Sequence, residues 1–72
     1  MRAIFINKEP ILLGQFLKFA GIIVNGGEAK FFLTNANVKV NEISENRRGK
    51  KLFSGDLVEI DGVKYQIVLE NK

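Results

Sequence analysis

The residues best suited to chemistry in this chain form one short cationic run, Arg47-Arg48-Gly49-Lys50-Lys51. Like charges crowded this closely repel one another, so folding alone gains nothing from them. Arginine can grip a phosphate with two parallel hydrogen bonds, lysine binds it as a mobile point charge, and the glycine lets the backbone approach a partner. The run therefore predicts contact with a phosphate backbone, and the alternative is a solvated loop kept charged for solubility.

Further cations strengthen this interpretation if they lie on the same side of the molecule. We expect Lys18 to face outward on a first helix, Lys30 on a second helix, and Lys39 on the strand that follows. Together with the cationic run they would form a continuous basic face, which is the electrostatic footprint of nucleic-acid binding. Since no platform of aromatic rings is evident, we expect recognition of shape and backbone rather than of base sequence.

A second candidate contact is Asn25-Gly26-Gly27, at the expected start of the second helix. Free backbone N–H groups at a helix N-terminus can bind a phosphate, and two glycines leave the approach open. Glu28 would compete with an anion there, and a tight turn between the helices is the simpler interpretation. These three residues are therefore candidate backbone contacts only.

Catalysis is not predicted. The chain has no His and no Cys, which removes the usual general base at neutral pH, the commonest metal ligand, thiolate metal sites and disulfides. No carboxylate pair stands in a setting that would split its pKa values, and no nucleophile lies beside a base. We therefore expect a non-enzymatic protein with no cofactor and no small-molecule substrate.

Length and composition predict one domain, residues 1–72, in the cytoplasm. So short a chain buries only about 60% of the surface that its unfolded form exposes, but a hydrophobic content of 46% is enough for one core. The N-terminal residues lack the apolar length and cleavage site of a signal peptide, and no run approaches the ~20 apolar residues of a membrane span. The formal net charge is +3, so the placement of charge matters more than its total.

The apolar spacing predicts an α+β fold, with two short helices packed on a small, mostly antiparallel sheet. The first helix covers residues 13–20 and ends at Gly21, and the second runs from Gly26 to about Thr34, burying Ala29, Phe32 and Leu33. Strands are expected at residues 1–6, 38–41, 56–60 and 63–69. Asp61-Gly62 between the last two predicts a two-residue hairpin turn that pairs Val58 with Tyr65 and Glu59 with Lys64.

Four short motifs follow one another along residues 11–60: LGQFLKFAG at 13–21, NGGEAK at 25–30, VKVN at 38–41 and GDLV at 55–58. Their ordered series resembles the S-four (S4) RNA-binding domain, the αL motif. The run from Arg47 to Leu52 looks like the short bacterial group in which that domain is the whole protein. The chain departs from the wider family at Asn25-Gly26, where Ser-Arg is frequent, and at Ala36 and Glu42, where Gly is common.

The resemblance implies a module that docks structured RNA, either ribosomal RNA or tRNA, through its two helices and adjoining loops, with the ribosome as a candidate partner. The positions that correspond to RNA contacts in the family are Lys18, Asn25, Gly26, Gly27, Lys30, Asn37, Lys39 and Asn41. The short bacterial group adds Arg47, Arg48, Lys50 and Lys51.

One alternative function uses the same basic face. The chain could be a protein-interaction adaptor that docks an acidic partner, such as a replication or ribosome-assembly factor. Co-purification separates the two hypotheses, because bound RNA is sensitive to nuclease and a bound protein is not.

Overall fold

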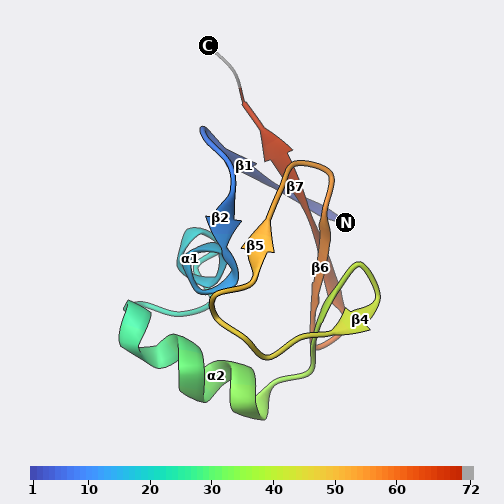
Figure 1. Cartoon of the computed structure of the whole chain (residues 1–72). Coiled ribbons are helices and arrows are strands. Elements are labelled where there is room, and N and C mark those ends of the chain that lie inside the picture. The colour runs from blue at the N-terminus through green and yellow to red at the C-terminus, as the bar shows by residue number, and fades with distance from the viewer. Residues whose placement is uncertain (71–72) are drawn as a thin grey trace.

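A five-stranded sheet forms one layer of the computed structural model, which describes residues 1–70 (Figure 1). Its strands are β1 (Arg2–Ile6), β3 (Val38–Val40), β4 (Ile43–Ser44), β6 (Leu57–Ile60) and β7 (Val63–Leu69), in the order β1-β7-β6-β3-β4. β1 runs parallel to β7, and the other neighbours in this sheet are antiparallel. The predicted sheet, including its first strand, is confirmed. β4 was not predicted, because its two residues are exposed and show no alternation.

The hairpin between β6 and β7 has the predicted turn and register. Asp61 and Gly62 have φ angles of 47° and 88°, and the positive values at both positions suit the right-handed twist of the strands they join. Val58 lies opposite Tyr65, and Glu59 lies opposite Lys64.

Two short helices share one core with the sheet, and Phe16 of the first helix meets Tyr65 of β7 edge to face, with ring centroids 5.5 Å apart. The helix α1 (Leu13–Phe19) buries Leu13, Phe16 and Leu17 completely, as the apolar spacing predicts. Gly21 follows it with a φ of 74°, a left-handed conformation that glycine adopts without strain. Within residues 1–70, neither helix is long and apolar enough to cross a membrane.

The second helix begins later than predicted. Gly26–Glu28 form a single 3₁₀ turn, η1, and the α-helix proper, α2, runs over Ala29–Asn35. Such turns are frequent at helix starts, and two successive glycines weaken the α conformation. Phe32 was predicted to be buried, but it is half-buried at the margin of the core, while Ala29 and Leu33 are buried as expected.

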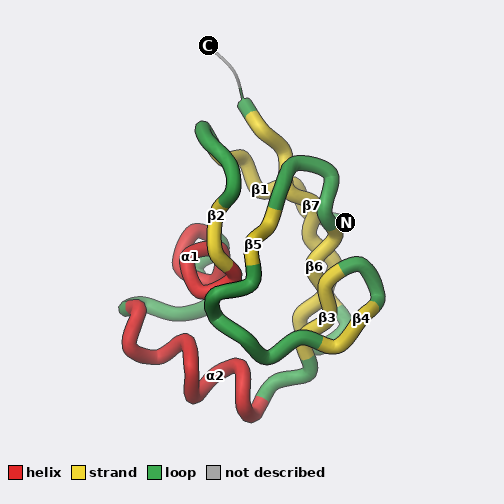
Figure 2. The backbone as a smooth tube through the Cα atoms, in the orientation of Figure 1, coloured by secondary structure: helices red, strands yellow, loops and turns green. Residues whose placement is uncertain are grey.

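A second, two-stranded sheet was not predicted at all. β2 (Ile11–Leu12) pairs antiparallel with β5 (Lys51–Leu52), so that Leu12 lies opposite Lys51 (Figure 2). Ile11 is 5% exposed and Leu52 is fully buried, so apolar side chains anchor both strands in the core. This pairing carries the cationic run across to the start of α1.

Candidate nucleic-acid interface

The first turn of α1 is capped by the backbone of the basic loop, by which we mean residues 47–51. The N–H of Leu13 donates to the carbonyl oxygen of Lys50 at 2.8 Å, and the N–H of Gly14 donates to that of Arg48 at 3.0 Å. The first N–H groups of a helix have no partner inside the helix, and a side-chain oxygen usually satisfies them. Because the loop supplies carbonyls instead, its backbone is held against α1.

Gly14 allows α1, α2 and the basic loop to approach closely. A Cβ atom added at Gly14 would lie 3.4 Å from the Cβ of Arg48 and 3.6 Å from the Cβ of Ala29. A side chain larger than a methyl group would therefore push the loop or α2 outward. This close approach accounts for a glycine inside a helix, where it costs about 1 kcal/mol relative to alanine.

A groove of about 390 Å³ lies where α1, the start of α2 and the basic loop meet. We call it the interhelical groove, and it is lined by Leu12, Gly14, Gln15, Lys18, Gly26, Ala29, Arg48 and Gly49. Among these residues the charged side chains are Lys18 and Arg48, and both are cationic. The structure thus brings Lys18 of the first helix, Gly26 before the second helix and Arg48 of the loop to one place.

Three more predicted cations are neighbours of residues that line the groove. Lys51 is exposed on β5, directly opposite the groove residue Leu12. Lys50 is half-buried beside it, and its N–H donates to the carbonyl of Arg47 at 3.1 Å, which closes a turn in the loop. Lys30 is exposed on α2, about one helical turn beyond Gly26.

Arg47 differs from its neighbour Arg48, because its charge is already paired. Its Nε lies 2.9 Å from Oε2 of Glu45 and its Nη2 lies 3.2 Å from Oε1, and its backbone N–H also donates to Oε2 at 3.1 Å. These bonds lower the pKa of Glu45 to about 2 and raise the pKa of Arg47. Sequence reasoning missed Glu45, although its position two residues before Arg47 was a visible signal.

Lys39 does not join the groove. Val38 and Val40 on either side of it are buried in the core, so strand alternation puts Lys39 on the outer face of the sheet. There it lies opposite Glu59, and Glu59 in turn lies opposite Lys64. The predicted basic face therefore does not include Lys39, because the alternation of side chains along the strand separates Lys39 from Lys18 and Arg48.

The two asparagines beside β3 hold turns in place. The side chain of Asn41 accepts the N–H of Leu57 at 3.0 Å and donates to Oδ1 of Asp56 at 3.2 Å. The backbone N–H of Asn37 donates to Oδ1 of Asp61 at 2.9 Å. Their predicted contact with RNA stays a prediction, and for Asn41 it would require the amide to leave its bonds within the fold.

Glu28 occupies the start of the second helix, as the sequence suggested. Its Oε1 accepts the N–H groups of Asn25 at 3.0 Å and of Val24 at 2.8 Å, and these bonds lower the pKa of Glu28. Neither N–H can bind a phosphate while the carboxylate is in place. Gly26 nevertheless lines the interhelical groove, and its lack of a side chain keeps that end open.

The fold and the groove define a small α+β domain with a cationic hollow between two short helices. The model of the S4 domain family matches residues 4–68, so the chain belongs to the S4 domain family. It is also similar to the probable ribosome maturation protein RlbA of Bacillus subtilis (strain 168), with 53% identity over 66 residues that cover 90% of this chain and 93% of that protein. No solved structure matches significantly. Both matches point to an RNA-related function.

Proposed function

We propose that this domain binds structured RNA by laying a stretch of phosphate backbone along the interhelical groove. The observation that carries the proposal is that Lys18 and Arg48, far apart in the sequence, line one groove in which Gly14, Gly26 and Gly49 leave room for a backbone. The bound RNA is ribosomal RNA in preference to tRNA, in line with the name of the similar Bacillus subtilis protein. The cytoplasm, where ribosomes mature, is then the place of action.

The chemistry of the groove is that of binding without catalysis. The Arg48 guanidinium can hold a phosphate with two parallel hydrogen bonds, and Lys18 supplies a point charge from α1. Lys30, Lys50 and Lys51 extend the positive potential beyond the groove, and each released counterion adds to the affinity. Because phosphates carry no sequence information, RNA shape decides where the domain docks.

The test compares two double variants that remove the same charge from different sides of the molecule. Lys18→Ala/Arg48→Ala empties the groove of its cations, and Lys39→Ala/Lys64→Ala removes two from the outer face of the sheet. Binding to Bacillus subtilis ribosomal RNA and bulk tRNA is measured across a range of KCl concentrations. At about 0.7 of log–log slope per phosphate contact, the groove variant should lose about 1.4 of slope and the outer-face variant almost none.

Equal losses in the two variants would show that the groove has no special role and that net charge alone drives binding. Thermal melting of each variant checks that the fold survives. A stoichiometric, nuclease-resistant protein that co-purifies with the chain, in place of RNA, would favour the adaptor alternative. Crosslinking in cells followed by sequencing of the attached RNA would identify the RNA itself.

A further inference from the structure

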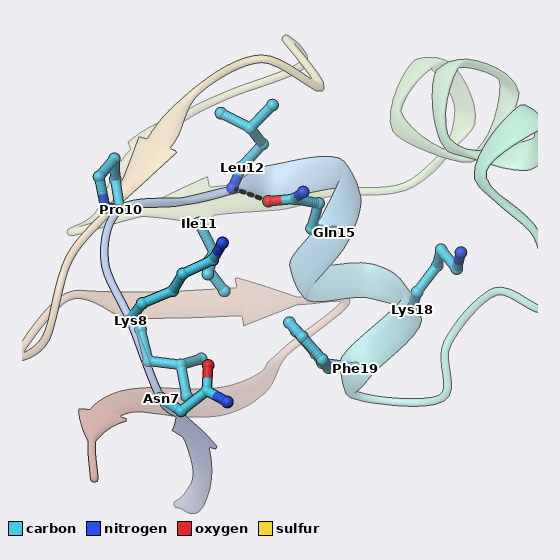
Figure 3. A pocket seen from close by; sticks show the side chains of 9 residues that line it. Asn7, Lys8, Pro10, Ile11, Leu12, Gln15, Lys18 and Phe19 are labelled. Carbon is cyan, nitrogen blue, oxygen red and sulfur yellow. Dashed lines mark hydrogen bonds between the residues drawn. The ribbon is translucent and has the colours of Figure 1, made fainter. Parts of the chain in front are cut away.

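A larger pocket, of about 620 Å³, opens beside the interhelical groove, between the turn after β1 and the outer side of α1 (Figure 3). This volume falls within the range of about 300–1,000 Å³ that small-molecule sites occupy. Its base includes Ile6 and Ile11, which are 4% and 5% exposed. The charged side chains among its lining residues are Lys8 and Lys18, both cationic. We call it the Phe19 pocket.

Phe19 is the aromatic residue among those that line the pocket, and it is one of several exposed rings on this chain, with Phe31 (75%) and Phe5 (60%). The side chain of Phe19 is 63% exposed, although burying such a ring would contribute about 1.5–3 kcal/mol. In Figure 3 the ring extends from the end of α1 toward the middle of the pocket, with Lys8 reaching in from the other side. A flat apolar ring with a cation, Lys8, across the pocket from it suits a nucleotide, because the ring can stack on a base while the lysine holds a phosphate.

Amide groups on the rim add hydrogen bonding of the kind that base edges need. Oε1 of Gln15 accepts the N–H of Leu12 at 2.8 Å, and the amino group of Gln15 has no hydrogen-bond partner among residues 1–70, so it can donate to a base. The amide of Asn7 lines the opposite part of the rim and can both donate and accept. The pocket therefore offers a stacking face, polar contacts to an edge and positive charge.

The rim is held in place before any ligand arrives. Oε2 of Glu9 accepts the N–H of Ser54 at 2.8 Å, which ties the turn that carries Asn7 and Lys8 to the turn after β5. The bond between Gln15 and Leu12 fixes the other side. A site formed in advance loses less conformational entropy on binding than a mobile one.

The Phe19 pocket adjoins the interhelical groove, because Leu12, Gln15 and Lys18 line both. A backbone that follows the groove and touches Lys18 has its next nucleotide at the mouth of the pocket. We propose that the Phe19 pocket holds one unpaired nucleotide of the bound RNA, with its base stacked on Phe19. This inference rests on the proposed RNA binding in the groove and adds that the preferred RNA has a bulged or looped-out residue.

The experiment uses two RNA hairpins that share one stem, one fully paired and one with a single bulged adenosine. Phe19→Ala should weaken binding of the bulged hairpin about tenfold, since stacking of a base on an aromatic side chain is worth about that much or more. Binding of the paired hairpin should not change. The salt dependence should also be unaltered, because no charge is removed.

Three further variants give the test its controls. Phe5→Ala removes a ring of similar exposure, 60%, from the outer face of the sheet and should have no effect. Phe19→Leu keeps the apolar contact without the ring and should bind the bulged hairpin as weakly as Phe19→Ala. Phe19→Trp should retain binding, and because the chain has no other Trp, quenching of its fluorescence by the bulged hairpin reports stacking directly.

The outcomes separate this inference from the proposal on which it rests. If Phe19→Ala binds the bulged hairpin as the unaltered chain does, while Lys18→Ala/Arg48→Ala loses binding, the pocket assignment is wrong and RNA binding in the groove stands. Full binding by Phe19→Leu would overturn stacking as the mode of contact. If the unaltered chain binds neither hairpin nor ribosomal RNA, both proposals fall.

Discussion

Replacing Arg48 with alanine is expected to weaken RNA binding more than replacing its neighbour Arg47. Arg48 lines the interhelical groove, whereas Arg47 is bonded to Glu45 at 2.9 and 3.2 Å. Loss of one charge-assisted contact to phosphate costs about 1.4 kcal/mol, or about tenfold in affinity. Arg47 must exchange its carboxylate partner for a phosphate. The Arg47 side chain is 73% exposed and that of Glu45 is 10% exposed, and a pair with one partner in solvent is worth about 1 kcal/mol, so the net contribution of Arg47 to binding is small.

The salt dependence of binding is a second, independent measure of the difference between Arg48→Ala and Arg47→Ala. If about six cations meet phosphates, at about 0.7 of slope each, the logarithm of the affinity falls with a slope near −4 in the logarithm of salt concentration. Arg48→Ala should bring the slope to about −3.5, and Arg47→Ala should leave it almost unchanged. Fluorescence anisotropy with labelled Bacillus subtilis ribosomal RNA fragments at about 50 to 200 mM KCl covers over two decades of affinity, enough to resolve the difference.

Glu45→Gln completes the set of variants. It removes the ionic partner of Arg47 and should make the slope steeper by about 0.7, because a further cation becomes available to phosphate. The double variant Glu45→Gln/Arg47→Ala should return to the original slope. Equal losses for Arg47→Ala and Arg48→Ala, or no change in Glu45→Gln, would refute the reasoning that the ion pair withholds Arg47 from RNA.

Three further predictions concern stability. Because Arg47 lowers the pKa of Glu45 to about 2, the stability that this carboxylate adds is complete above its ordinary pKa of 4.5 and is lost as the pH falls toward 2. Urea unfolding between these pH values should show a loss of about 1 kcal/mol that is absent in Glu45→Gln. Glu42 has a φ of 71°, a left-handed conformation that strains a residue with a Cβ atom. Glu42→Gly should raise the free energy of unfolding by about 0.5 kcal/mol, because the relief of this strain exceeds the added entropy of the unfolded chain. A lower melting temperature of Glu42→Gly would contradict this prediction. Asn41→Ala removes two side-chain hydrogen bonds from a residue with a φ of 51°. It should lower the free energy of unfolding, measured with urea, by about 2 kcal/mol. A decrease below about 0.5 kcal/mol would mean that these hydrogen bonds add little stability.

The turn between β3 and β4 shows that residue types alone do not determine backbone conformation. Glu42 stands where the S4 family commonly has glycine, yet Asn41 and Glu42 keep φ angles of 51° and 71°. Val40 still pairs with Ile43, and the side chain of Asn41 bonds to Leu57 and Asp56 across the turn. Contacts from a neighbouring strand thus maintain a left-handed conformation that glutamate alone would avoid.

The sequence by itself determined the features that depend on neighbours along the chain. Local patterns predicted the buried face of the first helix, the Asp61-Gly62 turn with its register, and the cationic run. These features could be predicted because helix and strand periods and turn residues act over a few positions. The motif series likewise pointed to the S4 family, to which the chain belongs.

Only the tertiary structure decided which of the candidate residues lie together. The capping of Leu13 and Gly14 by the carbonyls of Lys50 and Arg48 joins segments more than 30 residues apart, and no local pattern encodes such a bond. The same folding sends Lys39 to the outer face of the sheet, because a strand must turn alternate side chains away from the core. The groove and the Phe19 pocket exist for this reason: they are spaces between elements, and a space is defined only when the elements are packed.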